Sequence, residues 1–251
     1  MKGGYFHVTH NIAVTSSSVS KSTVYAGDIV VIRVTIKNKG DVTESFNVTC
    51  FYNITALETQ MITDLAAGAD TSLIFGWDTT DISPASYVIR VEADIVSGET
   101  NITDNTYVAG TVVVKAKATL YVTPQESMVT VGESFTVNIT ISNVANLYGF
   151  EFELKYNSTV LNILNITEGG FLEQGGETLF YPEINNIQGY AYVVSLLLGD
   201  IPGVNGIGTL ATITFEAIGE GASLIDLYNT KLRDPQPKPI PHTTIDGSVE
   251  V

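Results

Sequence analysis

The 251-residue sequence contains a single cysteine, Cys50, which excludes an internal disulfide. A fold without disulfides must be held by its hydrophobic core and by the closure of its sheets. Cys50 shares one side of a strand-like alternation with Phe46 and Val48. That position predicts a small buried apolar side chain and not a reactive thiol.

Positive charge is also scarce. Lysine and arginine total 12 against 27 aspartate and glutamate residues, which gives a formal net charge of −15. A nucleic-acid-binding surface needs clustered basic residues, so the composition excludes one. An anionic membrane surface would repel the chain for the same reason. The acidity is explained by solubility, with an acidic face for cations or a cationic partner as the alternative.

Long apolar runs are missing as well, and no stretch reaches the roughly 18 residues of a membrane-spanning helix. The opening residues lack the apolar stretch of a signal peptide. Charged residues make up only 16% of the sequence, so Thr, Ser and Asn must supply the polar surface, as in many extracellular β-proteins. We therefore expect an extracellular or cell-surface chain that is an excerpt from a longer secreted protein.

Recognisable catalytic and metal-binding patterns do not occur. The sequence has no Gly-x-Ser-x-Gly elbow, no phosphate loop before a helix and no Asp-x-Asp-x-Asp-Gly calcium loop. The histidines His7, His10 and His242 lack the spacing of a zinc site. Glu151 and Glu153 are two apart, which predicts a solvated strand face and not a hydrolase pair. We expect no enzyme, no catalytic residue, no metal ligand and no cofactor.

Calcium is left open as an alternative, because several aspartates lie in or near predicted turns. These aspartates are Asp78, Asp81, Asp94, Asp104 and Asp200.

What the sequence does contain is alternation with a period of two. Residues 29–37 place four β-branched side chains on one face and polar ones on the other, and residues 135–141 repeat the pattern. Further strand-like runs occupy residues 87–95, 108–114, 150–156, 190–198, 209–217 and 244–251. Short helical turns are expected only around 124–127 and 158–161. Many short strands separated by turn residues predict sandwiches or barrels.

One signature occurs twice. Gly27-Asp28, a core strand and Asn38 line up with Gly132-Glu133, a second strand and Asn143, at an offset of 105 (132 − 27 and 143 − 38). Two copies are too few for a solenoid, but they fit two sandwiches. We predict an all-β chain with a tail over residues 1–9 and tandem β-sandwiches over 10–115 and 118–251. A stiff proline-rich loop over 234–241 should precede the last strand.

The first half carries residues 10–14, Gly27-Asp28, Asn38-Lys39-Gly40, Trp77-Asp78-Thr79-Thr80 and 98–105. Together they resemble the cell-adhesion-related (CARDB-type) immunoglobulin-like domains. The resemblance implies an Ig-like sandwich with the tryptophan in the core. It also implies that a Glu-x-x-x-x-x-Asn turn joins the last two strands.

The second half carries Val131-Gly132-Glu133 and the stretches 146–156 and 206–217. These resemble cohesin-like domains, as found in archaeal extracellular surface proteins. The resemblance implies a jelly-roll sandwich that can hold a calcium-bound dockerin on one sheet face. No dockerin-like calcium loop occurs here, so such a partner would be another chain or a missing segment. The candidate protein-binding face comprises Phe150, Phe152, Leu154, Tyr190, Tyr192 and Val194.

Six Asn-x-Ser/Thr sequons indicate N-glycosylation in the native host, with ordinary polar strand residues as the alternative. The candidate acceptors are Asn47, Asn53, Asn101, Asn138, Asn157 and Asn165. Asn47 and Asn138 alternate with apolar neighbours and should therefore face solvent.

These observations favour a non-catalytic binding and scaffolding module, with the first sandwich as a spacer or adhesion unit and the second as the recognition unit. A carbohydrate-binding module is the first alternative, because Tyr190 and Tyr192 share a face and Phe180-Tyr181-Pro182 adds aromatic surface. A structural subunit of a surface layer or filament is the second. The partner would accordingly be a protein, such as a dockerin-bearing chain, or a polysaccharide.

Overall fold

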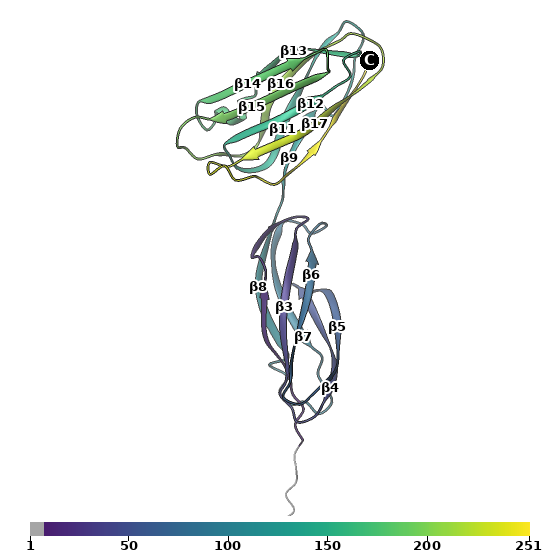
Figure 1. Ribbon diagram of the computed structural model, residues 1–251, viewed down its shortest axis with the longest axis vertical. Helices are drawn as coiled ribbons and strands as arrows, with labels where there is room; N and C mark the ends of the chain where they lie inside the picture. Colours follow the sequence, from purple (N-terminus) through teal and green to yellow (C-terminus); the bar gives the residue numbers. More distant parts are fainter. Residues whose placement is uncertain (1–7) are drawn as a thin grey trace, which may run out of the picture. The chain divides into compact units, whose positions relative to one another are not determined.

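The computed structural model describes residues 8–251, and the chain divides into two compact units between Ala116 and Lys117 (Figure 1). Each unit is built from β-strands in facing sheets, so the prediction of an all-β chain with two tandem sandwiches is confirmed. Residues 1–7 of the predicted tail, with His7, lie outside the described residues. No helix in the described part of the chain is long and apolar enough to cross a membrane.

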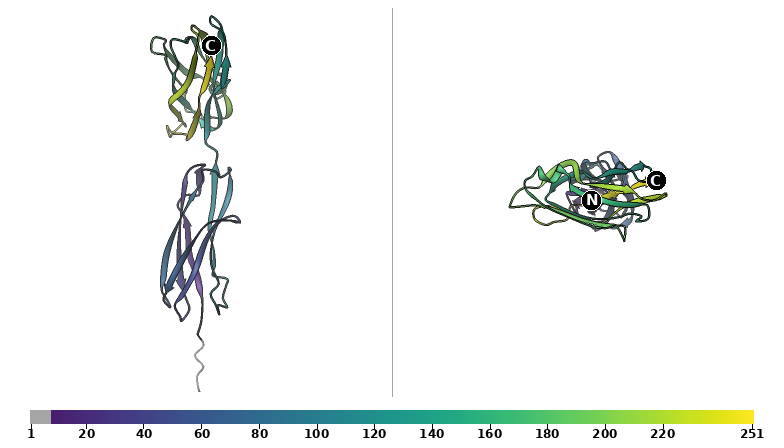
Figure 2. Two further views of the ribbon diagram at one scale, coloured as in Figure 1. Left: turned by 90° about the vertical axis from the view of Figure 1, so that its right-hand side faces the viewer. Right: turned by 90° about the horizontal axis from the view of Figure 1, so that it is seen from above.

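The first unit packs a three-stranded sheet, β1-β3-β6, against a five-stranded sheet, β2-β8-β7-β4-β5. Figure 2 shows its two facing layers from the side. All pairings are antiparallel except that of β2 with β8. The strands are β1 (Ile12–Val19), β2 (Thr23–Tyr25), β3 (Ile29–Asn38), β4 (Glu44–Tyr52), β5 (Thr55–Leu65), β6 (Asp70–Asp78), β7 (Ala85–Ala93) and β8 (Thr106–Lys115).

Alternation places one face of each strand in the core of this unit. On β3 the four predicted core residues, from Val30 to Ile36, are all buried. Trp77 is 1% exposed, and its ring stacks on Tyr52 with 5.1 Å between centroids. Cys50 is fully buried, and that burial raises the pKa of its thiol to about 11. The predictions of a core tryptophan and a buried cysteine are therefore confirmed.

The Glu-to-Asn turn between β7 and β8 is held by one carboxylate. Glu99 Oε1 accepts a hydrogen bond from the backbone N–H of Ile12 at 2.6 Å. Glu99 Oε2 accepts from the N–H of Val96 at 3.1 Å and from Asn105 Nδ2 at 2.9 Å. A single side chain thus ties the start of β1 to both ends of the turn and satisfies three donors that burial would otherwise leave unpaired.

The second unit packs a six-stranded sheet, β10-β19-β17-β12-β15-β14, against a five-stranded sheet, β13-β16-β11-β9-β18. Its strands are β9 (Ala118–Thr123), β10 (Glu126–Met128), β11 (Ser134–Leu147), β12 (Gly149–Lys155), β13 (Leu161–Glu168), β14 (Thr178–Asn185), β15 (Tyr190–Leu197), β16 (Val204–Ala217), β17 (Ala222–Arg233), β18 (His242–Ile245) and β19 (Gly247–Glu250). Two parallel pairs, β10 with β19 and β9 with β18, join strands from the start of this unit to strands from its end.

The one helix of the described chain is α1 (Gly170–Glu173), in a glycine-rich segment where the sequence predicted none. Its Phe171 and Leu172 are buried and anchor it against the core. The turn predicted at 158–161 exists and is closed by Leu161 N–H donating to Asn157 O at 2.9 Å. The prediction of a helical turn at 124–127 is wrong, because strand β10 begins at Glu126 and pairs with β19.

We predict that Glu99→Ala lowers the free energy of unfolding of the first unit by about 2–3 kcal/mol, because three N–H donors lose their acceptor. Urea denaturation followed by tryptophan fluorescence measures this, since Trp77 is the only tryptophan and reports on the first unit. Glu99→Gln keeps one acceptor oxygen and should lose less. A midpoint for Glu99→Ala equal to that of the unmodified chain would contradict this account of the turn.

Candidate protein-binding face

The outer face of the six-stranded sheet is the candidate site. Strands β17, β12, β15 and β14 lie side by side in this sheet, with β14 at its edge (Figure 1). Residues paired across antiparallel strands project to the same side of the sheet. Glu151 of β12 is opposite Val194 of β15 and Lys231 of β17, and Val194 in turn is opposite Tyr181 of β14. We call the outer surface of these four strands the sheet face.

Half of the predicted binding face is wrong. Phe150, Phe152 and Leu154 are at most 2% exposed and belong to the core of the second unit. The reason is the period of two, because the same strand can present only the alternate set, Glu151 and Glu153 with Lys155, to solvent. The apolar residues of β12 therefore belong to the interior and not to a contact surface.

The predicted residues of β15 lie on the outside. Tyr190, Tyr192 and Val194 are half-buried, while the alternating Ala191 and Val193 are fully buried. This settles which side of β15 faces the core, a question that the sequence left open. The tyrosines gain their partial burial from neighbouring side chains on the sheet face.

Aromatic and acidic side chains alternate along the rows of the sheet face. One row runs from Glu183 through Tyr192 and Glu153 to Tyr228. The ammonium group of Lys155 lies 4.1 Å from the centroid of the Tyr228 ring. Farther out, Tyr181 is 55% exposed, next to the exposed Leu179. The face therefore combines apolar and aromatic surface with charged groups.

A β-bulge on β17 brings Tyr228 to this face. The register shifts between Glu151, which is opposite Lys231, and Glu153, which is opposite Tyr228. Asn229 has a φ of 47°, and its Nδ2 donates to Glu153 Oε2 at 3.1 Å. Because of the extra residue, Tyr228 and Lys231 both point outward although they are three positions apart.

Carboxylates on the sheet face act on the tyrosines and the lysine beside them. Desolvation, followed by the Glu153 carboxylate, raises the pKa of Tyr228 to about 12. Desolvation and nearby carboxylates also raise the pKa of Tyr190 and Tyr192. The hydrogen bond from Lys231 Nζ to Glu151 Oε1, at 2.5 Å, raises the pKa of that ammonium group. All these shifts are upward, because desolvation and nearby carboxylates disfavour the charged tyrosinate, while the Glu151 carboxylate favours the charged ammonium group.

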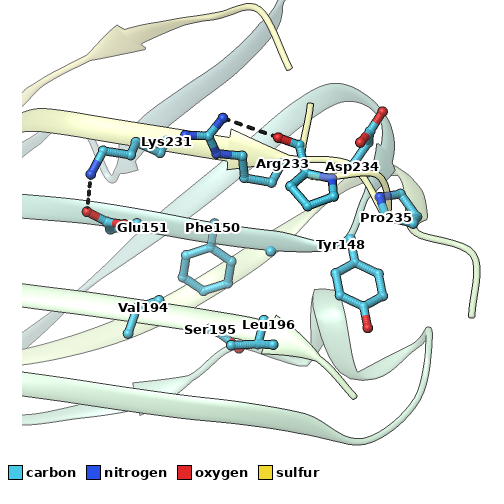
Figure 3. A pocket seen from close by; sticks show the side chains of 12 residues that line it. Tyr148, Phe150, Glu151, Val194, Ser195, Leu196, Lys231, Arg233, Asp234 and Pro235 are labelled. Atoms are coloured by element: carbon cyan, nitrogen blue, oxygen red, sulfur yellow. Dashed lines mark hydrogen bonds and ion pairs between the residues drawn. The ribbon is translucent and has the colours of Figure 1, made fainter. Parts of the chain in front are cut away.

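A hollow of about 400 Å³ lies at one end of the sheet face (Figure 3). It is bordered by Tyr148, by Val194 and Leu196 of β15, by Lys231 and Arg233 of β17, and by the proline-rich loop. Tyr148 donates from its hydroxyl to Gly199 O at 2.5 Å. The loop expected at 234–241 therefore exists, and it forms a wall of this hollow.

Five of the six sequon asparagines are exposed, and Asn138 is half-buried because its Oδ1 accepts a hydrogen bond from Thr212 Oγ1 at 2.7 Å. The asparagine of two sequons also bonds its own threonine. Thr103 Oγ1 donates to Asn101 Oδ1, and Thr159 Oγ1 donates to Asn157 Oδ1, each at 2.8 Å.

Two histidines and one of the turn aspartates have side-chain partners within their own units. His10 Nδ1 lies 2.5 Å from Glu44 Oε1, and His242 Nε2 lies 2.9 Å from Thr230 Oγ1. Lys39 Nζ pairs with Asp104 at 2.9 Å. Within residues 8–251, no three His, Cys, Asp or Glu side chains are grouped so that they could hold a metal ion.

Several residues of the sheet face were missed by the sequence analysis. Strand β14 was not predicted, although Phe180-Tyr181-Pro182 was noted as aromatic surface. Strand β17 was not predicted either, because its bulge breaks the period of two that would have revealed it. The hollow could not be predicted from the sequence. It depends on the pairing of β12, β15 and β17, which sets which of their residues lie next to one another.

Family comparisons agree with this architecture. The model of the family described as “Cohesin domain” matches residues 120–251, more than half of the chain, and the model of the CARDB family matches residues 9–109. The chain belongs to the cohesin family. The predicted order, a CARDB-type unit followed by a cohesin-like one, is confirmed. Both are binding-type domains, and the cohesin assignment makes the chain a protein-binding module.

Solved structures similar to this chain include several cohesins. One is a non-cellulosomal cohesin from Archaeoglobus fulgidus, with 19% identity over 54% of this chain and 91% of that one, at a TM-score of 0.45. Another is a type I cohesin–dockerin complex from Clostridium thermocellum, with 18% identity over 53% and 98% and a TM-score of 0.48. A type II cohesin from Acetivibrio cellulolyticus has 17% identity over 53% and 95% and a TM-score of 0.47. No curated protein matches the chain.

We predict that Phe152→Ala lowers the free energy of unfolding of the second unit by about 3–5 kcal/mol, because it empties a core position. Tyr192→Ala, one strand away and facing outward, should cost about 1 kcal/mol or less. Hydrogen exchange of the β15 amides measures both. Equal losses for the two variants would contradict the assignment of the two faces.

Proposed function

We propose that this chain is a non-catalytic, extracellular binding and scaffolding module whose second unit binds a dockerin-bearing protein on the sheet face. The observation that carries the proposal is the composition of that face. It presents tyrosines and aliphatic side chains at its centre, with carboxylates and lysines among and around them. Protein interfaces have this mixture of an aromatic, apolar centre and a polar rim.

Tyrosine is well suited to this role, because it gives contact area with few rotatable bonds and a hydroxyl that can pair across the interface. Tyr192 lies between the carboxylates of Glu153 and Glu183 on neighbouring strands. A partner that brings a cationic side chain to this place would meet two carboxylates and a ring face. Membership of the cohesin family supports a protein as the partner.

The first unit is proposed as a spacer or adhesion unit. Its eight strands pack around a core that includes Trp77, and the Glu99 carboxylate ties the start of β1 to the turn between β7 and β8. The extracellular location is supported by the CARDB and cohesin matches.

We predict that Tyr192→Ser and Glu153→Lys each weaken dockerin binding about tenfold or more, because both remove central contacts of the sheet face. Surface plasmon resonance with dockerin modules from the genome that encodes this chain is the measurement. A chelator should release the partner, since dockerins hold calcium in their own loops.

Thr136→Lys is the matched control. Thr136 is exposed on the outer side of the opposite sheet, so this variant should bind as the unmodified chain does. Loss of binding in the control but not in Tyr192→Ser would place the interface elsewhere. If no dockerin of that genome binds while a glycan array gives a specific ligand, the carbohydrate-binding alternative replaces the proposal.

We further propose that the exposed sequons carry N-linked glycans in the native host. Asn101 and Asn157 are the best candidates, because their sequon threonines already contact the asparagine side chain. Asn138 should stay unmodified, since it is half-buried and bonded to Thr212. Intact mass and glycopeptide mapping of the native protein test this. A native mass equal to that of the bare sequence would remove the proposal.

A further inference from the structure

The hollow at the end of the sheet face arises from one missing side chain. Gly149 of β12 lies opposite Leu196 of β15 and opposite Arg233 of β17. All three positions belong to the outward row next to Val194, Glu151 and Lys231. Because Gly149 has no side chain, the row has walls at Leu196 and Arg233 and a gap between them.

Neighbouring atoms preserve this gap. A Cβ added at Gly149 would lie 3.1 Å from Ser195 O and 3.3 Å from Leu196 Cβ, so a larger residue would crowd strand β15. The end of the row is closed by Tyr148, whose hydroxyl is fixed to Gly199 O, and by Pro235 and Pro237 of the loop. Much of the lining is therefore apolar, and Tyr148 and the two proline rings have little freedom to collapse into the hollow.

Four charged groups border the hollow, and three of them are already engaged. Glu151 and Lys231 pair with each other at 2.5 Å (Figure 3). Asp234 Oδ1 accepts hydrogen bonds from the backbone N–H groups of Gln236 and Lys238, each at 2.9 Å. Arg233 is exposed and makes one long contact, 3.4 Å from its Nη1 to Pro237 O, and has no carboxylate partner among the residues that the structure describes.

We infer that this hollow anchors the partner protein through an apolar side chain that is followed by an acidic residue. The apolar side chain fills the gap above Gly149, against Leu196 and the proline rings. The acidic side chain then receives the unused N–H donors of the Arg233 guanidinium, which are arranged to bind a carboxylate. The inference rests on the proposed binding function of the sheet face and names the chemistry of one contact within it.

Size and position agree with an anchor of this kind. A hollow of about 400 Å³ lies near the lower end of the size range of small-molecule pockets and has room for one large side chain. Pockets that take a single buried side chain are where the binding energy of an interface is concentrated. The hollow is also continuous with the sheet face, because Glu151, Val194 and Lys231 belong to both.

The test uses the full chain and two capped dipeptides, N-acetyl-Leu-Asp-amide and N-acetyl-Leu-Asn-amide. Amide and arginine side-chain resonances are followed by NMR as each dipeptide is added. We expect shifts at Gly149, Val194, Leu196 and Arg233 Nε. The aspartate dipeptide should bind about threefold more tightly than the asparagine one, as for an exposed ion pair.

Arg233→Gln should remove the difference between the two dipeptides and keep the leucine contact. Leu196→Trp should fill the gap and abolish binding of both dipeptides. If that variant does not fold, the test rests on the comparison of Arg233→Gln with the unmodified chain. Leu224→Ser, at an exposed outward position elsewhere on β17, is the matched control and should change nothing. Absence of shifts at the hollow, or equal binding of both dipeptides to the unmodified chain, would overturn the inference.

Failure of this inference can be told apart from failure of the proposed function. A chain that binds the dipeptides at the hollow but binds no dockerin keeps the anchor and loses the dockerin proposal. A chain whose dockerin affinity falls with Tyr192→Ser but not with Arg233→Gln keeps the function and loses the anchor.

Discussion

Alternation of side chains across the sheets is the constraint on which both units depend, and strand β12 shows it most clearly. Its inward residues, Phe150, Phe152 and Leu154, fill the core that joins the two sheets. Its outward residues Glu151, Glu153 and Lys155 carry charge and form part of the proposed binding face. The core and the proposed face therefore use the same seven-residue strand, and a shift of register by one position would exchange the two sets of side chains.

In both units the same kind of glycine turn precedes the long core strand. Gly27 and Gly132 have φ values of 90° and 89°, in a region that favours glycine. In each case the next residue turns its carboxylate back to the N–H three positions earlier, Asp28 to Tyr25 at 3.0 Å and Glu133 to Thr130 at 3.1 Å. The repeated glycine–acid pair in the sequence thus has a physical cause: it forms the tight turn that comes directly before a long core strand.

The asparagines that complete the pattern are not equivalent. Asn38 is fully buried, donates to Val42 O and Leu65 O, and accepts from Gly40 N. Asn143 is exposed, with a φ of 55°, in a stretch of β11 where the register shifts. Identical residues at matched positions therefore serve a hydrogen-bond network in one unit and a backbone irregularity in the other. Composition and spacing do not separate these roles.

Regular features of the fold could be predicted from the sequence, and irregular ones could not. The period of two located β3, β12 and β15, and the flanking turn residues showed where they end. Strand β17 was not predicted because its bulge at Asn229 interrupts the period of two. Helix α1 was not predicted because four residues are too few to show a helical period. Of the candidate face, the three β15 residues lie outside as expected, while Phe150, Phe152 and Leu154 of β12 lie in the core, on the side that their alternation with Glu151 and Glu153 indicates.

Recognition by the outward side of one sheet is the central claim, and hydrogen exchange of the full chain with and without a bound dockerin tests it most directly. The account predicts slower exchange in β12, β14, β15 and β17 when the partner is bound, with β9, β11 and β16 unchanged. Slower exchange confined to the opposite sheet or to the first unit would contradict it.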